Sequence, residues 1–171
     1  MTNSELKEIG RKEGVRLDQG DSSPLFIFGE CLSNTGKWGE FRKDAEFYME
    51  IDTGSDRTLM SITLANRLGI EIKYFVMPKV IIGVGGKRIS CEKYGIVRMR
   101  VRTVKNQYVV IQFLTYIMDY EIPPLLGSDV MASLGCSISY KYKVLFIKKH
   151  VLHQRIIKLS NNKNRYSDIR L

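Results

Sequence analysis

A chain of 171 residues, 44% of them hydrophobic, is long enough to form one domain with a buried core. It has no apolar run of membrane-spanning length and no secretory signal at its start, so we expect neither a membrane partner nor secretion. The net charge of +9 allows nucleic acid as a partner. Three widely spaced cysteines exclude a disulfide framework or zinc cage and predict ordinary buried or half-buried thiols.

Composition divides the chain into three parts. Residues 1–24 are polar and charged without periodicity, which predicts a mobile leader. Residues 25–147 contain the apolar segments and are expected to form the folded domain. Residues 148–171 carry seven Lys and Arg side chains against the single acid Asp168. This last part is predicted to be a basic tail or linker, with weak nucleic-acid contact as the alternative.

The first two apolar segments, at 25–28 and 47–51, alternate with period two and are predicted strands. The second is followed at once by Asp52-Thr53-Gly54-Ser55, which places a carboxylate where a strand breaks into a turn. The glycine lets the backbone pass close to a substrate or a symmetry mate, and the two hydroxyl groups can hold the carboxylate and brace the turn. The alternative is an ordinary turn aspartate that bonds its own backbone.

A short helix and a hairpin are predicted next. Apolar residues recur at helical spacing between Ser61 and Gly69, which predicts a helix that stops at the glycine. The segment 81–89 has apolar residues on both sides of a glycine-rich centre, which is typical of a β-hairpin whose tip is bare backbone. Such a tip can close over an extended peptide.

The second half of the domain is again rich in strands. Valine and methionine alternate with arginine over 97–102, which predicts a strand with one apolar and one solvent-exposed face. The segments 108–113 and 144–147 are β-branched and aromatic and are also predicted strands, in a mostly antiparallel arrangement.

Between these strands, the segment 123–131 indicates a short apolar strand that ends at Gly127 and leads into a helix. Ser128 or Asp129 is the predicted cap of that helix, which we expect to stop at Gly135. The chain therefore reads as mainly β with one or two short helices.

In combination and in this order, three of these segments resemble the retropepsins, the aspartic proteases of retroviruses, retrotransposons and pararetroviruses, together with the related domain of ubiquitin-shuttle proteases. The resemblance covers roughly residues 46–147. Asp52-Thr53-Gly54-Ser55 matches the active-site run, and residues 82–87 match the flap that covers the substrate. Leu125-Leu126-Gly127 matches the apolar pair and glycine that pack beneath the catalytic turn.

The resemblance implies a closed acid-protease β-barrel with one or two short helices that works as an obligate dimer. Asp52 is then the catalytic residue, and Thr53, Gly54 and Ser55 support the active-site loop. Leu125, Leu126 and Gly127 pack beneath the active site. The implied substrate-binding residues are Asp56, Gly83, Val84, Gly85 and Gly86.

Two features depart from the retroviral pattern. Retroviral members carry arginine directly after the second glycine, where it pairs with the acid that Asp56 matches, whereas this chain has Ser128. The resemblance therefore does not extend to the ion pair that braces the dimer. The helical segment between Ser61 and Gly69 is also an insertion, as in retrotransposon and ubiquitin-shuttle members, which favours a retroelement or pararetrovirus relative.

Only one Asp-Thr-Gly run is present, so we expect the second carboxylate of the catalytic pair to come from a second copy in a homodimer. The predicted function is hydrolysis of peptide bonds by a water activated between two Asp52 carboxylates, with a retroelement or viral polyprotein as substrate. The expected location is the cytoplasm or a viral or retroelement particle. No cofactor and no metal site are indicated. The alternative is a non-catalytic peptide-binding or assembly domain with the same fold.

Overall fold

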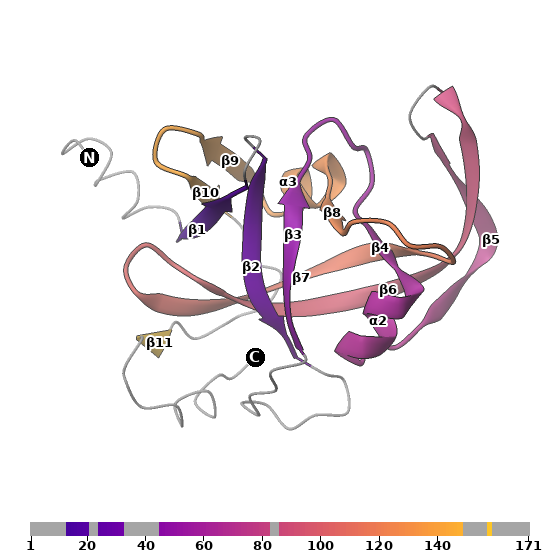
Figure 1. The fold of residues 1–171 in the computed structure, drawn as a ribbon, viewed down its shortest axis with the longest axis horizontal. Coiled ribbons are helices and arrows are strands. Elements are labelled where there is room, and N and C mark those ends of the chain that lie inside the picture. The colour runs from indigo at the N-terminus through magenta and orange to yellow at the C-terminus, as the bar shows by residue number, and fades with distance from the viewer. Residues whose placement is uncertain (1–12, 21–23, 33–44, 83–85, 149–156, 159–171) are drawn as a thin grey trace.

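The structure is a computed structural model that describes residues 13–20, 24–32, 45–82, 86–148 and 157–158. Strands dominate these residues, and the two helices among them are short (Figure 1). The helices are α2 (Ile62–Leu68) and α3 (Ser128–Ser133). The strands are β1 (Glu13–Gln19), β2 (Leu25–Cys31), β3 (Glu46–Ile51), β4 (Leu59–Ser61), β5 (Lys73–Ile82), β6 (Arg88–Arg102), β7 (Gln107–Met118), β8 (Leu125–Leu126), β9 (Cys136–Ser139), β10 (Val144–Ile147) and β11 (Ile157–Lys158).

Six of the strands close into a barrel. The hydrogen-bonded order β6-β7-β4-β8-β3-β2 returns to β6, because β2 pairs with β6 as well as with β3. The inward side chains of these strands, among them Ile27, Met49 and Met99, are fully buried and form one continuous core. Hydrophobic burial of this kind is the main favourable term in folding. The prediction of a mainly β closed barrel with one or two short helices is confirmed.

Helix α2 forms where the sequence predicts it. The Ser61 hydroxyl accepts a hydrogen bond from the Leu64 N–H at 3.2 Å, which caps the first turn. Gly69 ends the helix in the left-handed conformation with φ of 72°, which favours glycine. The apolar face, with Ala65 and Leu68, is buried in the core. Among the described residues, no helix is both long enough and apolar enough to cross a membrane.

The prediction of a mobile leader over residues 1–24 is wrong for Glu13–Gln19. These residues form β1, which pairs with β10 and with β2, and Val15 and Leu17 are buried. The alternation of those two apolar side chains with polar ones is too short to stand out in the sequence. It becomes a strand because two neighbouring strands satisfy its backbone and cover its apolar face. Residues 1–12 lie outside the described part of the chain.

The predicted tail over residues 148–171 also contains a strand. Within it, β11 pairs with β7 through Ile157 opposite Tyr108. The rest of the tail from residue 149 lies outside the described residues, and so does the surface on which the nucleic-acid alternative depends. The division of the chain into leader, domain and tail therefore stays a prediction, with the folded part now extended by β1 and β11.

The predicted solvent-exposed face over residues 97–102 is wrong at its centre. Arg102 is exposed, but Arg100 is only 1% exposed and forms an ion pair with Glu30, which is 5% exposed. The two residues stand directly opposite each other where β6 pairs with β2, and the Arg100 guanidinium also lies over the Tyr108 ring. Arginine is tolerated inside the fold because the neighbouring strand supplies its counter-charge.

The three cysteines are free thiols, as the sequence predicts. Cys31 and Cys91 are buried and Cys136 is half-buried. Burial raises the pKa of the Cys91 thiol and raises the pKa of Cys136 to about 12. Both of these side chains are therefore protonated near neutral pH, which makes them packing residues rather than nucleophiles.

The buried ion pair gives a stability prediction. Replacing Glu30→Ala leaves the Arg100 charge buried without its carboxylate, so we expect the free energy of unfolding to fall by about 3–5 kcal/mol. The double change Glu30→Leu with Arg100→Met removes both charges and is expected to unfold closer to the wild type. Urea denaturation measures both effects. The control is Glu92→Ala, at an exposed position of β6, the strand that carries Arg100. An equal effect of the changes at Glu30 and Glu92 would contradict the buried ion pair.

Candidate active site

Asp52 stands at the end of β3, where that strand is held by β8. The two strands are parallel, with Ile51 opposite Leu126. The ladder continues one step further, because the Asp52 N–H donates to the carbonyl oxygen of Leu126 at 3.0 Å. The carboxylate is half-buried and follows directly on a strand of the barrel. The sheet therefore holds the backbone of Asp52 in place, and the side chain of Asp52 projects from the end of the strand.

The turn after Asp52 is braced by hydrogen bonds of its own. The Gly54 N–H donates to the Asp52 carboxylate at 3.0 Å, and the Ser55 N–H donates to the Asp52 carbonyl oxygen at 3.2 Å. The Ser55 hydroxyl donates to the carbonyl oxygen of Arg57 at 2.7 Å. The sequence suggests that the hydroxyl groups hold the carboxylate and brace the turn. The Ser55 hydroxyl has the second of these roles. One oxygen of the Asp52 carboxylate has no hydrogen-bond donor among the described residues, which leaves it available to a ligand.

A buried threonine and an aspartate hold this turn against α3, and sequence reasoning missed this contact. Thr58 is fully buried, and its hydroxyl and N–H donate to the two carboxylate oxygens of Asp129 at 2.8 and 3.2 Å. The same hydroxyl accepts from the Gly127 N–H at 2.9 Å. Thr58 and Asp129 are 71 residues apart, so no local spacing indicates that they meet.

The predicted capping of α3 by Ser128 or Asp129 is wrong. The N-cap residue is Gly127, which makes no side-chain capping bond. The Asp129 carboxylate is instead occupied by Thr58 and by the adjacent Val130 N–H. Ser128, which stands where retroviral members carry arginine, donates its backbone N–H to the Ser55 carbonyl oxygen at 2.8 Å. The turn is thus tied to α3 by backbone and carboxylate bonds within one protomer.

Position 127 requires glycine because the surrounding backbone leaves no space for a side chain. A Cβ atom at this position would lie 2.5 Å from the Arg57 carbonyl oxygen and 2.8 Å from the Ser55 carbonyl oxygen, which no side chain tolerates. The contrast is Gly54, where a Cβ atom would meet only the Asp52 carboxylate, at 3.4 Å. The packing of Leu126 and Gly127 beneath the active site stays a prediction. The structure shows that both residues contact the turn through their backbones and that the space outside Gly54 is open in the protomer.

A cleft of about 420 Å³ separates the turn from the β5–β6 hairpin. It is lined by Asp52 and Leu125 and, from β5, by Val80 and Ile82, which are 58% and 66% exposed. The predicted hairpin over residues 81–89 is present, with Ile82 opposite Arg88 as the pair next to its loop. The other residues that line the cleft are Gly54, Ser55, Asp56, Arg57, Leu59, Ile81, Ile89, Met118 and Tyr120.

The structure therefore brings together most of the predicted site. Asp52, Gly54, Ser55 and Asp56 line one cleft with Leu125. Thr53 is exposed on the same turn. Gly83, Val84 and Gly85 lie outside the described residues, and Gly86 is exposed with φ of 77°. A positive φ favours glycine and is expected next to a hairpin tip.

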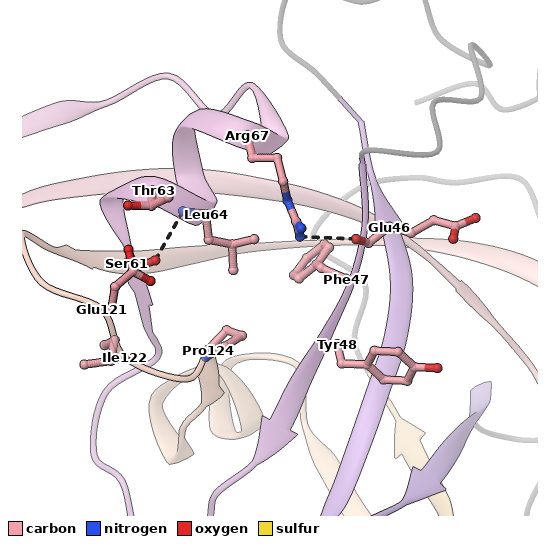
Figure 2. Close-up of a pocket in the computed structure, with 10 residues that line it drawn as sticks. All are labelled: Glu46, Phe47, Tyr48, Ser61, Thr63, Leu64, Arg67, Glu121, Ile122 and Pro124. Carbon is pink, nitrogen blue, oxygen red and sulfur yellow. Dashed lines mark hydrogen bonds between the residues drawn. The ribbon is translucent and has the colours of Figure 1, made fainter.

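A second cavity of about 440 Å³ lies between α2, β3 and the loop before β8 (Figure 2). No residue of the Asp52 turn lines it. Two carboxylates do, but Figure 2 shows Glu46 and Glu121 at opposite ends, with Glu46 pointing away from the cavity. The Arg67 guanidinium donates to the Glu46 backbone oxygen at 3.4 Å across its rim. Paired-carboxylate chemistry therefore has no basis here. The described residues also contain no group of three or more His, Cys, Asp or Glu side chains suited to a metal ion.

Comparison with known proteins gives one family match. The family model described as aspartyl protease matches residues 39–130, which include the Asp52 turn, the hairpin and the start of α3. This match confirms the resemblance to aspartic proteases that the sequence motifs carry. No curated protein matches the sequence.

Similar solved structures have low sequence identity. The EIAV protease in complex with the inhibitor HBY-793 is 17% identical with a TM-score of 0.44, over 71% of this chain and 98% of that chain. A retropepsin-like aspartic protease from Rickettsia conorii is 14% identical with a TM-score of 0.44, over 80% and 90% of the two chains. The retroviral protease-like domain of Ddi1 from Leishmania major is 17% identical with a TM-score of 0.38, over 80% and 96%.

The two glycines of the site give a matched prediction. Gly127→Ala drives a methyl group into the Arg57 backbone, so we expect the free energy of unfolding to fall by about 1–3 kcal/mol or more. Within one protomer, Gly54→Ala places the same methyl group next to the Asp52 carboxylate alone, at 3.4 Å, and is expected to change the free energy of unfolding of the isolated protomer by less than about 0.5 kcal/mol. Thermal and urea unfolding of both variants measure the difference. Equal effects of the two changes would show that the close approach at Gly127 is not as described.

Proposed function

This chain belongs to the aspartyl protease family as a retropepsin-like member, and on that premise we propose that it is an endopeptidase in which Asp52 supplies one carboxylate of a catalytic pair. The observation that carries the proposal is the position of Asp52. Its carboxylate lies on the floor of a cleft, on a turn that the barrel holds in place, opposite a hairpin. A reactive group on a rigid support is what catalysis of amide hydrolysis requires.

Two carboxylates that share one proton perform the reaction. The ionised one takes a proton from a water as the water oxygen bonds to the scissile carbonyl carbon, and the protonated one donates to the carbonyl oxygen. The C–N bond then breaks as the amide nitrogen takes up a proton and leaves as an amine. Because two adjacent like charges cannot both ionise easily, the pair loses its protons in two steps, and cleavage is expected to peak at a pH between them.

The second carboxylate comes from a second copy of the chain. One protomer has a single Asp-Thr-Gly run, and the exposed Thr53 together with the open space outside Gly54 gives room for the same turn of a partner. A twofold axis through this point brings two Asp52 carboxylates together, with Thr53 of each copy tying the two turns. The cleft contains one further carboxylate, Asp56, which in this proposal accepts hydrogen bonds from the substrate backbone.

The cleft suits an extended peptide. Apolar side chains from both sides, among them Leu59, Ile82 and Met118, form its walls, so apolar residues next to the scissile bond are favoured. The backbone of residues 83–86 closes over the peptide from the hairpin tip, as the sequence resemblance implies. The same resemblance makes a retroelement or viral polyprotein the expected substrate.

Substitution of each cleft carboxylate tests the assignment. Asp52→Asn removes the proton acceptor and is expected to lower cleavage of a peptide library, followed by mass spectrometry, by about 10²–10⁴-fold or more. Asp56→Asn is expected to raise KM while cleavage continues. Inhibition of the wild type by a pepstatin-type compound is the second readout. Loss of cleavage in Asp56→Asn with retention in Asp52→Asn would overturn the proposal, and a folded dimer without any cleavage would favour the non-catalytic alternative.

A mixing experiment tests the shared pair. When wild type and Asp52→Asn are refolded together in equal amounts, activity is expected to fall to about a quarter of the wild-type value, because only dimers with two intact carboxylates work. A catalytic site within each protomer predicts about half. Wild type refolded with the same amount of Glu92→Ala is the control for dilution, since that exposed residue lies outside the cleft.

A further inference from the structure

We propose that Arg57 makes the cleft selective for peptides that carry an acidic side chain within a few residues of the scissile bond, an inference that rests on the function proposed above. Three charged residues line the cleft: Asp52, Asp56 and Arg57. The other described lining residues are apolar or uncharged. Asp52 is assigned to the chemistry, and Arg57 is the one cation among the described residues that line the cleft.

Arg57 is held in position by an aromatic ring. Its guanidinium carbon lies 5.5 Å from the centre of the Tyr116 ring. Tyr116 belongs to β7 and is only 8% exposed, so the ring is fixed by the core. Stacking of a guanidinium on a ring face orients it and leaves the N–H donors along its edge accessible.

No carboxylate among the described residues occupies those donors. Among the described residues the ion pairs are Lys93 with Asp119 and Arg100 with Glu30, and neither includes Arg57. The side chain of Arg57 is exposed, and its backbone oxygen serves the turn by accepting from Ser55. The guanidinium of Arg57 contacts the Tyr116 ring, and among the described residues no carboxylate pairs with its charge.

A second cation lies on the same group of rings. The Phe75 ring packs against Tyr116 with ring centres 5.2 Å apart, and the Lys79 ammonium lies 5.6 Å from the centre of Phe75. Lys79 precedes Val80 in β5, and Val80 lines the cleft. Lys79 itself does not line the cleft, so among the described lining residues Arg57 remains the cation beside the acid Asp56.

A carboxylate fits this arrangement best. Guanidinium groups bind carboxylates through two parallel N–H···O bonds, and a guanidinium that is already oriented loses little entropy when it does so. Asp56 is an acceptor only, so it suits the backbone N–H groups of a bound peptide and does not compete for the same substrate group. Glutamate or aspartate at the position that reaches Arg57 is therefore preferred over the uncharged amides.

The test uses short synthetic peptides with a central Leu-Phe pair, in which each flanking position in turn carries Glu, Gln or Lys. The value of kcat/KM is measured for the wild-type dimer. We expect Glu to exceed Gln at one position on each side of the pair by roughly threefold to tenfold, which is the range for an exposed to partly desolvated charge pair. The preference is expected to shrink when salt is raised, because an exposed charge pair is screened.

Three substitutions separate recognition from structure. Arg57→Gln is expected to remove the preference for Glu, so that kcat/KM for the Glu peptide and for the Gln peptide agree within a factor of about two. Arg57→Glu is expected to reverse the preference toward Lys, a change that a purely structural role does not produce. The matched control is Arg67→Glu, an exposed arginine on the rim of the other cavity, which is expected to keep the preference for Glu (Figure 2).

Binding measurements distinguish a failure of this inference from a failure of the proposed protease function. The same peptides are titrated into the Asp52→Asn variant, and their affinities are compared. Tighter binding of the Glu peptide supports the inference even if no peptide is cleaved by the wild type, in which case the protease function fails alone. Cleavage without any preference for Glu, or a preference that survives Arg57→Glu, overturns the inference alone. Neither cleavage nor selective binding overturns both.

Discussion

The structure depends on the insertion of a two-residue strand, β8, between β3 and β4. Leu125 pairs with both neighbours, in parallel with Glu50 and antiparallel with Leu59, and this double pairing completes the ring of six strands. The chain leaves β8 through Gly127, whose missing side chain lets it pass against the backbone of Arg57. Because the Asp52 N–H is bonded to Leu126, the same insertion that closes the barrel also fixes the start of the candidate catalytic turn.

The turn is stabilised within one protomer by a buried hydroxyl and a carboxylate. Thr58 connects Asp129 on α3 with the Gly127 N–H, through partly buried bonds to Asp129 and a buried bond to Gly127 that is stronger than one at the surface. The retroviral proteases that the sequence resembles carry an arginine at the position of Ser128, which directly precedes Asp129 in this chain. Here the contacts that hold the turn to α3 come from backbone groups and from Asp129, and Arg57 remains free to face the cleft.

The cleft shows where the fold leaves apolar surface uncovered. Val80 and Ile82 project from β5, the terminal strand in the order of the described sheet, and each exposes more than half of its side-chain surface to solvent. Apolar side chains gathered on one wall opposite a carboxylate are typical of a site that is completed by a ligand. The buried Arg100–Glu30 pair is the reverse case, in which charged side chains are buried. These two charges are tolerated in the core because they lie opposite each other on adjacent strands.

By itself the sequence determined the features that arise from short-range patterns. The Asp52 turn, the helix between Ser61 and Gly69, the hairpin and the strand that ends at Gly127 each follow from residues close together in the chain, and all are where the sequence predicts them. Only the tertiary structure decided the burial of Arg100, the partnership of Thr58 with Asp129 and the inclusion of Glu13–Gln19 as a strand. Each of these three features depends on a partner dozens of residues away in the chain. The spacing of residues does not indicate which distant strands become neighbours.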